Sequence, residues 1–318
     1  LQTEPATKPI LTIGTRGSLL ALAQAKQVRR ELAQKNGLNP DEIAIQVIKT
    51  SGDIILDRPL SEVGGKGLFT KEIEVALFDK RIDLAVHSAK DVATMLPDGM
   101  ILPAFLERED TRDAFVSLRH KSLDDVPQGA KFGTSSIRRG AQILRQRPDL
   151  QIVEFRGNVQ TRMKKLEDGV AEATLLAYSG LKRLDMSHIA KQLIDPTIMP
   201  PAPGQGALAI ETRADDDQVN EWVRKLNHAP TAAKMVAERH YLHGLDGSCR
   251  TPIAAYSTLE NDELHIFGQV LSLDGQTVYE AEVSGHAADA EEIGKELASI
   301  IKSAAGDKFF ETFEKRED

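Results

Sequence analysis

Cysteine is almost absent from this sequence, and no long hydrophobic run is present. Cys249 is the one cysteine in 318 residues, so an internal disulfide is excluded, which fits a reducing compartment. No apolar stretch approaches the length of a membrane span or of the apolar core of a secretory signal. We read the polar residues 1–9 as a disordered lead-in, and we expect a cytoplasmic protein without membrane contact.

The common nucleotide and hydrolase motifs are also missing. The sequence has no phosphate-binding P-loop, no Gly-x-Gly-x-x-Gly after its first predicted strand, and no Gly-x-Ser-x-Gly. His240 and His243 lie three residues apart with Cys249 beyond them, but a fourth ligand at zinc-site spacing is missing. We therefore predict no metal site.

Charge is unevenly distributed along the chain. The net charge of −8 argues against a dedicated nucleic-acid binder. Residues 131–183 nevertheless hold eleven Lys/Arg against five Asp/Glu, a local charge of +6, which leaves −14 for the remainder. Such a basic segment attracts an anion.

The opening of the chain predicts a parallel α/β unit. A strand at 10–13 precedes Gly14 and a helix that Ser18 caps, with Leu22, Ala25, Val28 and Leu32 on one face. A second strand at 43–48 completes a βαβ unit. Residues 52–67 are rich in Gly and Asp and predict a loop of the length that lids have. A helix at 68–78 and a strand at 82–86 follow.

The same order of elements recurs after residue 107. Residues 100–113 are interpreted as a crossover into a second domain. Strands are then predicted at 114–118, 131–133, 150–155 and 173–178, with helices at 134–147 and 157–166 and a short helix reaching 184. Both domains are expected to present helix N-termini at the carboxyl ends of strands, where backbone N–H groups and the helix dipole bind anions.

The last third changes its period. A Pro-rich linker at 200–206 leads to a strand at 207–211 that is expected to return to the first sheet. Helices are predicted at 216–226 and 231–245, a hairpin around Asp274-Gly275, and a helix at 288–303. The predicted fold is thus two periplasmic-binding-protein-like α/β domains flanking a cleft, plus a small α+β C-terminal domain. We expect domains at 10–106 with 207–224, at 107–200, and at 229–318.

Two arginine-containing motifs follow predicted strands. Gly133-Thr134-Ser135-Ser136 precedes Arg138 and Arg139, and Arg156-Gly157 precedes Arg162. Hydroxyls, helix N–H groups and forked guanidinium groups together can hold carboxylates or phosphates. The alternative is a pair of capped surface helices with solvated arginines.

Asp91 and Cys249 are the candidates for chemistry. Asp91 follows a buried-type strand, where a carboxylate can accept hydrogen bonds from a ligand and stabilise a developing cation; the alternative is an ion pair at a strand end. Cys249 lies in a Gly-rich loop beside Arg250, which favours the thiolate. The alternative is a small buried hydrophobe.

A family resemblance is carried by ordered motifs along the whole chain. The sequence resembles the porphobilinogen deaminases, also called hydroxymethylbilane synthases. The matching stretches are Ile13-Gly14-Thr15-Arg16-Gly17-Ser18, Val63-Gly64-Gly65-Lys66-Gly67-Leu68-Phe69, His87-Ser88-Ala89-Lys90-Asp91-Val92, Glu107-Arg108-Glu109-Asp110, Arg112-Asp113-Ala114-Phe115, Gly133-Thr134-Ser135-Ser136, Arg156-Gly157-Asn158-Val159, Pro203-Gly204-Gln205-Gly206-Ala207 and Gly247-Ser248-Cys249.

This resemblance implies a transferase of tetrapyrrole (heme) biosynthesis. It joins four porphobilinogen molecules head to tail with loss of ammonia, and hydrolysis then releases hydroxymethylbilane. A dipyrromethane cofactor would be bound covalently through Cys249, and Asp91 would be catalytic. Cofactor contacts would come from Lys90, Asp91, Thr134, Ser135, Ser136, Arg138, Arg139, Arg156 and Gly157. Substrate contacts would come from Arg16, Ser18, Arg156, Arg162, Arg183 and Gln205, and lid contacts from Lys66 and Phe69.

Two other functions remain open at this point. Two α/β domains around a cleft also describe a non-enzymatic anion receptor, although that function leaves the third domain without a use. A cysteine-dependent hydrolase would use a histidine near Cys249, but a third orienting group is not evident. We expect a monomer that binds no nucleic acid.

Overall fold

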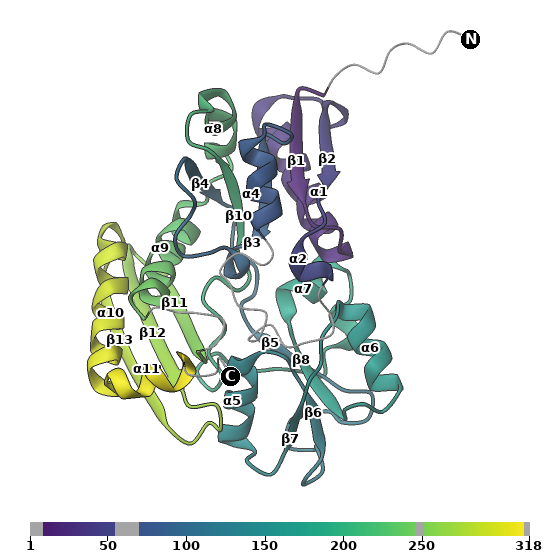
Figure 1. Cartoon of the computed structure of the whole chain (residues 1–318), viewed down its shortest axis with the longest axis vertical. Helices are drawn as coiled ribbons and strands as arrows, with labels where there is room; N and C mark the ends of the chain where they lie inside the picture. The colour runs from purple at the N-terminus through teal and green to yellow at the C-terminus, as the bar shows by residue number, and fades with distance from the viewer. Residues whose placement is uncertain (1–8, 55–69, 246–250, 315–318) are drawn as a thin grey trace. The chain divides into compact units, whose positions relative to one another are not determined.

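The computed structural model describes residues 9–54, 70–245 and 251–314, and they fall into two compact units (Figure 1). The first unit contains described residues up to 107 together with 207–229, and the second contains 108–206 and the residues from 230 onward. Three separate sheets are present within these residues. The predicted division into three domains stays a prediction, because the second and third sheets belong to one compact unit.

The first unit is built on a mixed sheet of strand order β2-β1-β3-β10-β4. β1 pairs in parallel with β2 and β3, which confirms the predicted βαβ unit. The predicted return strand is also confirmed, since β10 lies antiparallel between β3 and β4. The elements are β1 (Leu11–Thr15), α1 (Leu19–Asn36), η1 (Pro40–Glu42), β2 (Ile43–Val47), α2 (Ser51–Ile54), α4 (Lys71–Phe78), β3 (Leu84–Ser88), η2 (Ala89–Asp91), β4 (Met100–Phe105), β10 (Leu208–Arg213) and α8 (Asp217–Arg224).

One expectation in this unit was wrong. Residues 100–106 are not a crossover: Met100–Phe105 forms β4, whose ladder with β10 satisfies its backbone groups. The helix cap was correct, because Ser18 Oγ accepts a hydrogen bond of 3.2 Å from the N–H of Ala21. Behind this cap, Val28 and Leu32 of α1 pack into the apolar core of the sheet.

The second unit opens with a mixed sheet of strand order β7-β6-β8-β5-β9. β6 is parallel to β7 and β8, whereas β5 is antiparallel to β8 and β9. Ser136 caps α5 and Asn158 caps α6, so both predicted helix starts are confirmed. The elements are β5 (Asp113–Val116), β6 (Lys131–Gly133), α5 (Ile137–Gln146), β7 (Gln151–Val153), α6 (Val159–Glu167), β8 (Ala173–Ala177), α7 (Tyr178–Arg183), η3 (Ser187–Ile189) and β9 (Gln192–Leu193).

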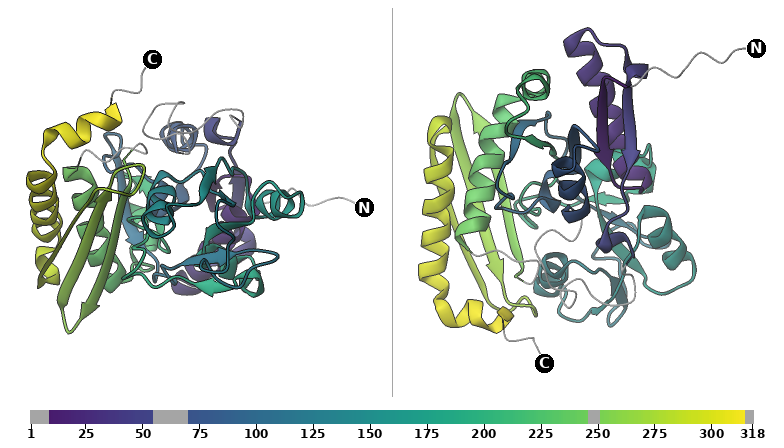
Figure 2. Two further views of the ribbon diagram at one scale, coloured as in Figure 1. Left: turned by 90° about the horizontal axis from the view of Figure 1, so that it is seen from below. Right: turned by 45° about the horizontal axis from the view of Figure 1, so that its top comes forward.

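The third sheet is antiparallel, with strand order β11-β12-β13 (Figure 2). Gly268 of β12 faces Tyr241 of α9 and Leu297 of α10, so both helices cover the same face of the sheet. Gln269 points the other way and accepts a 2.9 Å hydrogen bond from Gln142 of α5. The elements are α9 (Ala229–Gly244), β11 (Ile253–Glu260), β12 (Glu263–Leu271), β13 (Val278–His286), η4 (Ala287–Asp289), α10 (Ala290–Ala305) and α11 (Asp307–Glu314).

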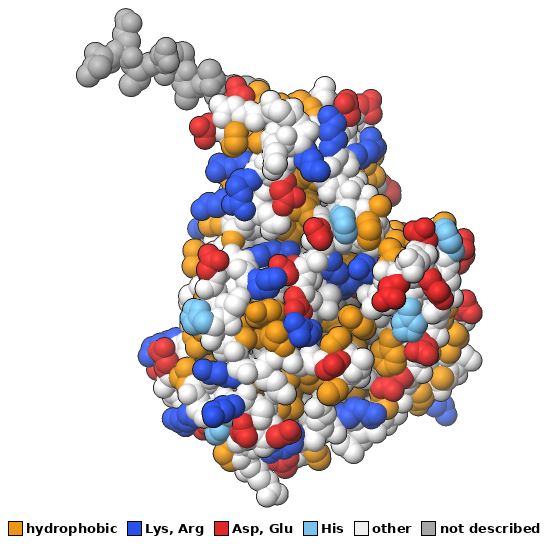
Figure 3. Space-filling model, turned by 180° about the vertical axis from the view of Figure 1, so that it is seen from behind, with side chains coloured by type: hydrophobic (Ala, Val, Ile, Leu, Met, Phe, Trp, Pro, Cys, Tyr) orange, Lys and Arg blue, Asp and Glu red, His pale blue; other side chains and the backbone are white. Residues whose placement is uncertain are grey.

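The predicted hairpin between β12 and β13 is confirmed, and a second one was missed. Gly275 in its turn has φ +70°, and a Cβ there would lie 2.3 Å from the carbonyl oxygen of Ala141, so this turn requires glycine. Asn261 and Asp262, both at positive φ, form the tight turn between β11 and β12. On the molecular face in Figure 3, acidic and basic side chains are interspersed. Of the helices described, none combines the length and apolarity that crossing a membrane requires.

A buried ion pair connects the third sheet to the start of the second unit. Arg108 donates to both carboxylate oxygens of Glu238, at 2.6 and 3.0 Å, and both side chains are almost fully buried. Glu238 also accepts from the backbone N–H of Gly204 at 2.6 Å and from the hydroxyl of Ser257. The pair thereby joins α9, β11 and the Pro-rich segment before β10.

Removing one partner of this ion pair is expected to destabilise the second unit strongly. Arg108→Leu leaves the Glu238 carboxylate buried without its counter-charge, which costs about 3–5 kcal/mol. Thermal unfolding followed by circular dichroism should show a midpoint lower by on the order of 10 °C. Arg119→Leu is the matched control, because its pair with Glu172 is exposed and surface pairs contribute about 0–1 kcal/mol. Equal midpoints for the two variants would contradict a structural role of the Arg108 pair.

Candidate active site

A pocket in the first unit lies where β1 and β3 end. Arg16 and Ser18 follow β1, Ser88 ends β3, and Asp91 closes the short helix η2; all four line the pocket. The carboxyl ends of parallel strands meet at one edge of a sheet, which is why residues more than seventy positions apart gather here. Lys90 and Asp91 are exposed to solvent. The structure therefore brings together three predicted site residues, Arg16, Ser18 and Asp91.

Two further residues of this region were missed by the sequence reasoning. His87 lines the pocket, and its Nε2 lies 2.8 Å from Oε2 of Glu211 on the neighbouring strand β10. Both side chains are at most 4% exposed. The sequence signal that could have singled out His87 is its position in an otherwise apolar strand. For Glu211, the sequence offers no signal beyond a charged residue in an apolar strand.

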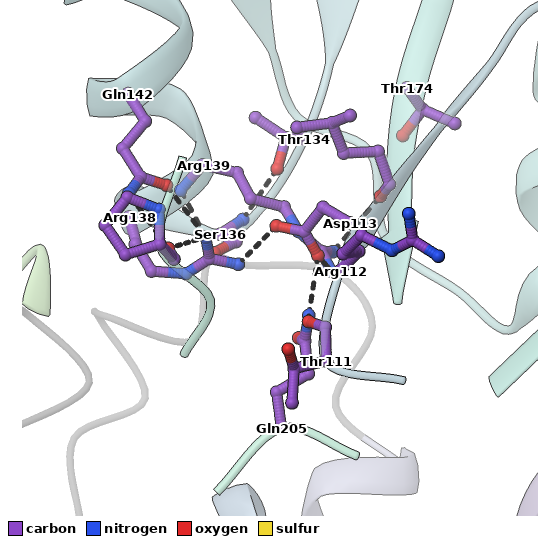
Figure 4. Close-up of polar contacts among 12 residues, drawn as sticks. Thr111, Arg112, Asp113, Thr134, Ser136, Arg138, Arg139, Gln142, Thr174 and Gln205 are labelled. Atoms are coloured by element: carbon purple, nitrogen blue, oxygen red, sulfur yellow. Dashed lines mark hydrogen bonds and ion pairs between the residues drawn. The ribbon is translucent and has the colours of Figure 1, made fainter. Parts of the chain in front are cut away.

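In the second unit, one buried carboxylate holds both adjacent arginines (Figure 4). Asp113, at the start of β5, accepts from Arg138 at 2.8 Å and from Arg139 at 2.7 Å. The amide of Gln205 donates to the same carboxylate at 2.8 Å. Burial alone would raise the pKa of Asp113, but the two guanidinium groups outweigh burial and hold that pKa far below its usual range.

The arginines use most of their other donors within the protein. Arg138 also donates to the side chain of Gln142 at 2.7 Å and to the carbonyl of Pro200 at 3.0 Å, and Arg139 donates to the carbonyl of Leu175 at 3.1 Å. The Nε atom of each arginine is buried and has no partner among the described residues. The surface-helix alternative is wrong for these two side chains, which are 5% and 7% exposed.

Gln205 and the hydroxyl residues also make local contacts. The Gln205 side chain is 1% exposed, and its amide donates to Asp113 and to the carbonyl of Thr111. Thr134 Oγ1 accepts from the N–H of Ser136 at 3.1 Å, and Ser135 Oγ accepts from the N–H of Phe155 at 3.1 Å. These bonds fix the chain between β6 and α5.

Arg162 lies in a cationic cluster at the start of α6. Its Nε donates to the carbonyl of Gly157 at 2.9 Å, and Gly157 has φ +117°, a conformation that glycine tolerates. Burial, together with the charges of Arg139 and Arg156, lowers the pKa of Arg162 to about 10. Like charges that crowd one another in this way favour an anionic ligand.

The remaining predicted residues are placed as follows. Arg183 is half-buried and donates to the carbonyl of Gly206 at 2.9 Å. His240 bonds the carbonyl of Val236 and lies 3.6 Å from Glu291. Cys249, Lys66 and Phe69 lie outside the described residues, as does most of the predicted lid loop. The cleft between the first two domains stays a prediction.

Comparison with known families decides which group of proteins this chain belongs to. Residues 11–221 match the family described as "Porphobilinogen deaminase, dipyromethane cofactor binding domain", and residues 232–303 match "Porphobilinogen deaminase, C-terminal domain". The chain belongs to the porphobilinogen deaminase family. The predicted resemblance is thereby confirmed.

Relatives in this family cover nearly the whole chain. The porphobilinogen deaminase of Nitrobacter hamburgensis is 51% identical over 98% of this chain and 99% of its own length. That of Paracoccus denitrificans is 50% identical over 95% of this chain and 96% of its own length. The stretch matched by these porphobilinogen deaminases therefore covers the pocket residues of the first unit and also Arg138, Arg139, Arg156 and Arg162 of the second.

Solved structures of other families resemble the chain only distantly. A periplasmic substrate-binding protein of an ABC transporter from Coxiella burnetii has a TM-score of 0.43 and 15% identity, covering 72% of this chain and 97% of its own. The periplasmic VFT2 domain of Bordetella pertussis BvgS has a TM-score of 0.41 and 13% identity, covering 73% and 92%. Scores this low carry no functional argument. The predicted α/β class with a C-terminal α+β portion is confirmed by the three sheets and their helices.

Substitution of Asp113 directly tests how Arg138 and Arg139 are held in this porphobilinogen deaminase family member. Asp113→Asn keeps the shape but removes the charge, leaving two buried guanidinium groups, and should cost about 3–5 kcal/mol. Because the folded-state pKa is lowered below the unfolded value of about 3.9, the carboxylate stabilises the fold fully above about pH 5 and less as the pH falls. Thermal unfolding at pH 5 and pH 8 should show the same large difference from wild type.

The control for Asp113 is Asp149→Asn in the same unit. Asp149 pairs with Arg147 in a partly exposed position, so its substitution should lower the unfolding midpoint much less than that of Asp113. If Asp113→Asn were no less stable than Asp149→Asn, the buried carboxylate would not be what holds the two arginines.

Proposed function

We propose that this chain catalyses the reaction of its family. It joins four porphobilinogen molecules head to tail, releases one ammonia for each, and frees hydroxymethylbilane by hydrolysis, a transferase reaction of tetrapyrrole biosynthesis. The observation that carries this proposal is the match to porphobilinogen deaminases over 98% of the chain. The arginines Arg138, Arg139, Arg156 and Arg162 support the proposal, because every pyrrole unit of the substrate carries two carboxylates that need cationic partners.

The family's dipyrromethane cofactor fits the residues of the second unit. Its carboxylates need several cationic donors, and burial together with the charges of Arg139 and Arg156 lowers the pKa of Arg162. The two buried Nε atoms of Arg138 and Arg139 are further donors without partners among the described residues. We assign cofactor binding to Lys90, Asp91, Thr134, Ser135, Ser136, Arg138, Arg139, Arg156 and Gly157, with the covalent bond through Cys249. When bound, the cofactor supplies the pyrrole to which the first substrate is joined.

The first unit supplies the reaction pocket in this proposal. Asp91 is exposed in the pocket, and its carboxylate accepts pyrrole N–H hydrogen bonds and stabilises the positive charge that develops as ammonia leaves. Arg16 and Ser18 bind substrate carboxylates beside it, and Arg156, Arg162 and Arg183 are the further substrate-binding arginines. Lys66 and Phe69 act on the lid.

Gln205, predicted above as a substrate-binding residue, contributes to substrate binding in this proposal by positioning other residues. Its side-chain amide donates a hydrogen bond to Asp113, and its backbone carbonyl accepts one from Nε of Arg108 at 2.9 Å. Gln205 thus connects the buried Arg108 pair to the carboxylate that holds Arg138 and Arg139. We propose that it aligns these two arginines.

The stoichiometry of turnover tests the function. Purified protein is incubated with porphobilinogen, ammonia is measured enzymatically, and the linear product is identified by mass spectrometry. Four ammonia molecules per hydroxymethylbilane support the proposal. Binding of porphobilinogen without ammonia release would instead support the anion-receptor function. Release of ammonia without formation of the linear tetrapyrrole would support a hydrolase.

Three lesser expectations belong to the same proposal. We propose a monomer, located in the cytoplasm, that binds no nucleic acid; the net charge of −8 supports the last point. Sedimentation analysis of the purified protein tests the monomer directly. A larger species at micromolar concentration would refute it.

A further inference from the structure

The pair of His87 and Glu211 has no part in the roles assigned so far. His87 pairs with Ala209 across the antiparallel β3–β10 ladder, and Glu211 pairs with Ala85, so the two side chains meet diagonally on one face of the sheet. Their 2.8 Å contact is buried, and the described part of the chain gives His87 one hydrogen-bond partner, Glu211. His87 is nevertheless one of the residues that line the pocket of Asp91.

Acidic groups surround this imidazole from several elements. Glu211 comes from β10 and Glu74 from α4, while Asp91 of η2 and Arg16 line the same pocket. Burial and the charge of Glu211 raise the pKa of Glu74. Oε1 of Glu211 is buried without a partner among the described residues. Glu211 and Glu74 therefore place carboxylate groups beside the imidazole of His87.

The proposed reaction needs a group that takes up a proton. The carbon–nitrogen bond of the aminomethyl group breaks, and the nitrogen of the incoming ammonium form leaves as ammonia with the bonding electron pair. A carbon–carbon bond forms at an unsubstituted pyrrole carbon, whose C–H bond then breaks and releases one proton. Proton and ammonia leave together as ammonium, so a base in the pocket must hold the proton in between.

We propose that His87 is this base, with Glu211 as the residue that positions it. An ionised carboxylate accepts hydrogen bonds, so Glu211 fixes the proton of the neutral ring on Nε2 and leaves the lone pair on Nδ1. Nδ1 accepts the proton released by carbon–carbon bond formation, and Glu211 stabilises the imidazolium that results. This inference rests on the proposed function and adds a second protein group to the pocket of Asp91.

Turnover of His87→Gln is the first test. Loss of a general base lowers rates by about 10²–10⁴-fold, so kcat should fall by at least about 10²-fold while the intact mass still shows the cofactor adduct. Added imidazole should restore part of the rate. His265→Gln is the matched control, since that histidine contacts Glu282 on the exposed part of the third sheet and should turn over normally.

Two results would overturn the role of His87. One is a His87→Gln enzyme within a few-fold of wild-type turnover with an unchanged pH–rate profile. The other is a slow enzyme that imidazole does not rescue. In both cases the wild-type protein is assayed alongside and must release ammonia and hydroxymethylbilane normally. The result then contradicts the role of His87 and leaves the proposed function intact.

A second measurement needs neither turnover nor a folded His87 variant. Nitrogen-15 NMR of the imidazole rings in Cys249→Ser protein reports which ring nitrogen of His87 carries the proton. We expect the proton of the neutral ring to lie on Nε2, facing Glu211, and the tautomer equilibrium to shift in Glu211→Gln. A neutral ring that carries its proton on Nδ1 contradicts a base at that atom.

Discussion

Cys249→Ser protein is expected to have the mass of its sequence alone and no measurable turnover. A serine hydroxyl is a far weaker nucleophile than a thiolate, so the cofactor should not become attached. Intact-mass spectrometry of wild type and variant, purified in parallel, gives the answer in one experiment. Wild type should exceed its sequence mass by one dipyrromethane.

The neighbouring Ser248→Ala is the matched control for this substitution. It changes the residue next to Cys249 but leaves the thiol in place, and it should retain both the adduct and turnover. Wild-type protein that turns over at full rate while carrying no adduct would exclude the covalent cofactor. An adduct that persists in Cys249→Ser would place the attachment elsewhere.

Asp91→Asn is expected to retain the adduct but to lose about 10²–10³-fold in kcat. The amide keeps the size of the side chain but removes the negative charge that stabilises the developing cation, and a preorganised electrostatic group of this kind contributes about that much. Steady-state turnover and intact mass are measured on the same sample.

Asp98→Asn provides the comparison within the first unit. Asp98 is exposed, like Asp91, but does not line the pocket, and its substitution should leave turnover unchanged. A near-normal rate for Asp91→Asn would show that this carboxylate is structural. A variant that also loses the adduct would assign Asp91 to cofactor assembly as well as to turnover.

The order of elements could be predicted from the sequence because each signal is local. The cap of α1 at Ser18, the βαβ opening, and the hairpin at Asp274-Gly275 depend on residues within a few positions of one another. The resemblance assigned Arg16, Ser18 and Asp91 to the site, and the structure gathers them in one pocket because strand ends of a parallel sheet share an edge.

The antiparallel members of the sheets were harder to predict. A short apolar run such as Met100–Phe105 does not reveal its direction or its partner, and it was taken for a crossover. Its partner strand β10 comes more than a hundred residues later, and only the pairing with β10 settles that Met100–Phe105 is a strand. β5 is likewise antiparallel within a sheet that local signals describe as parallel.

By itself, the sequence determined the family, the α/β class, and the residue types that a polycarboxylate substrate requires. Tertiary structure decided which charges face one another. Asp113 meets Arg138 from 25 positions away and Gln205 from 92, and His87 meets Glu211 from 124. A charged residue in an apolar strand carries no mark of its partner, because the burial that makes the pair necessary exists only once distant strands have packed.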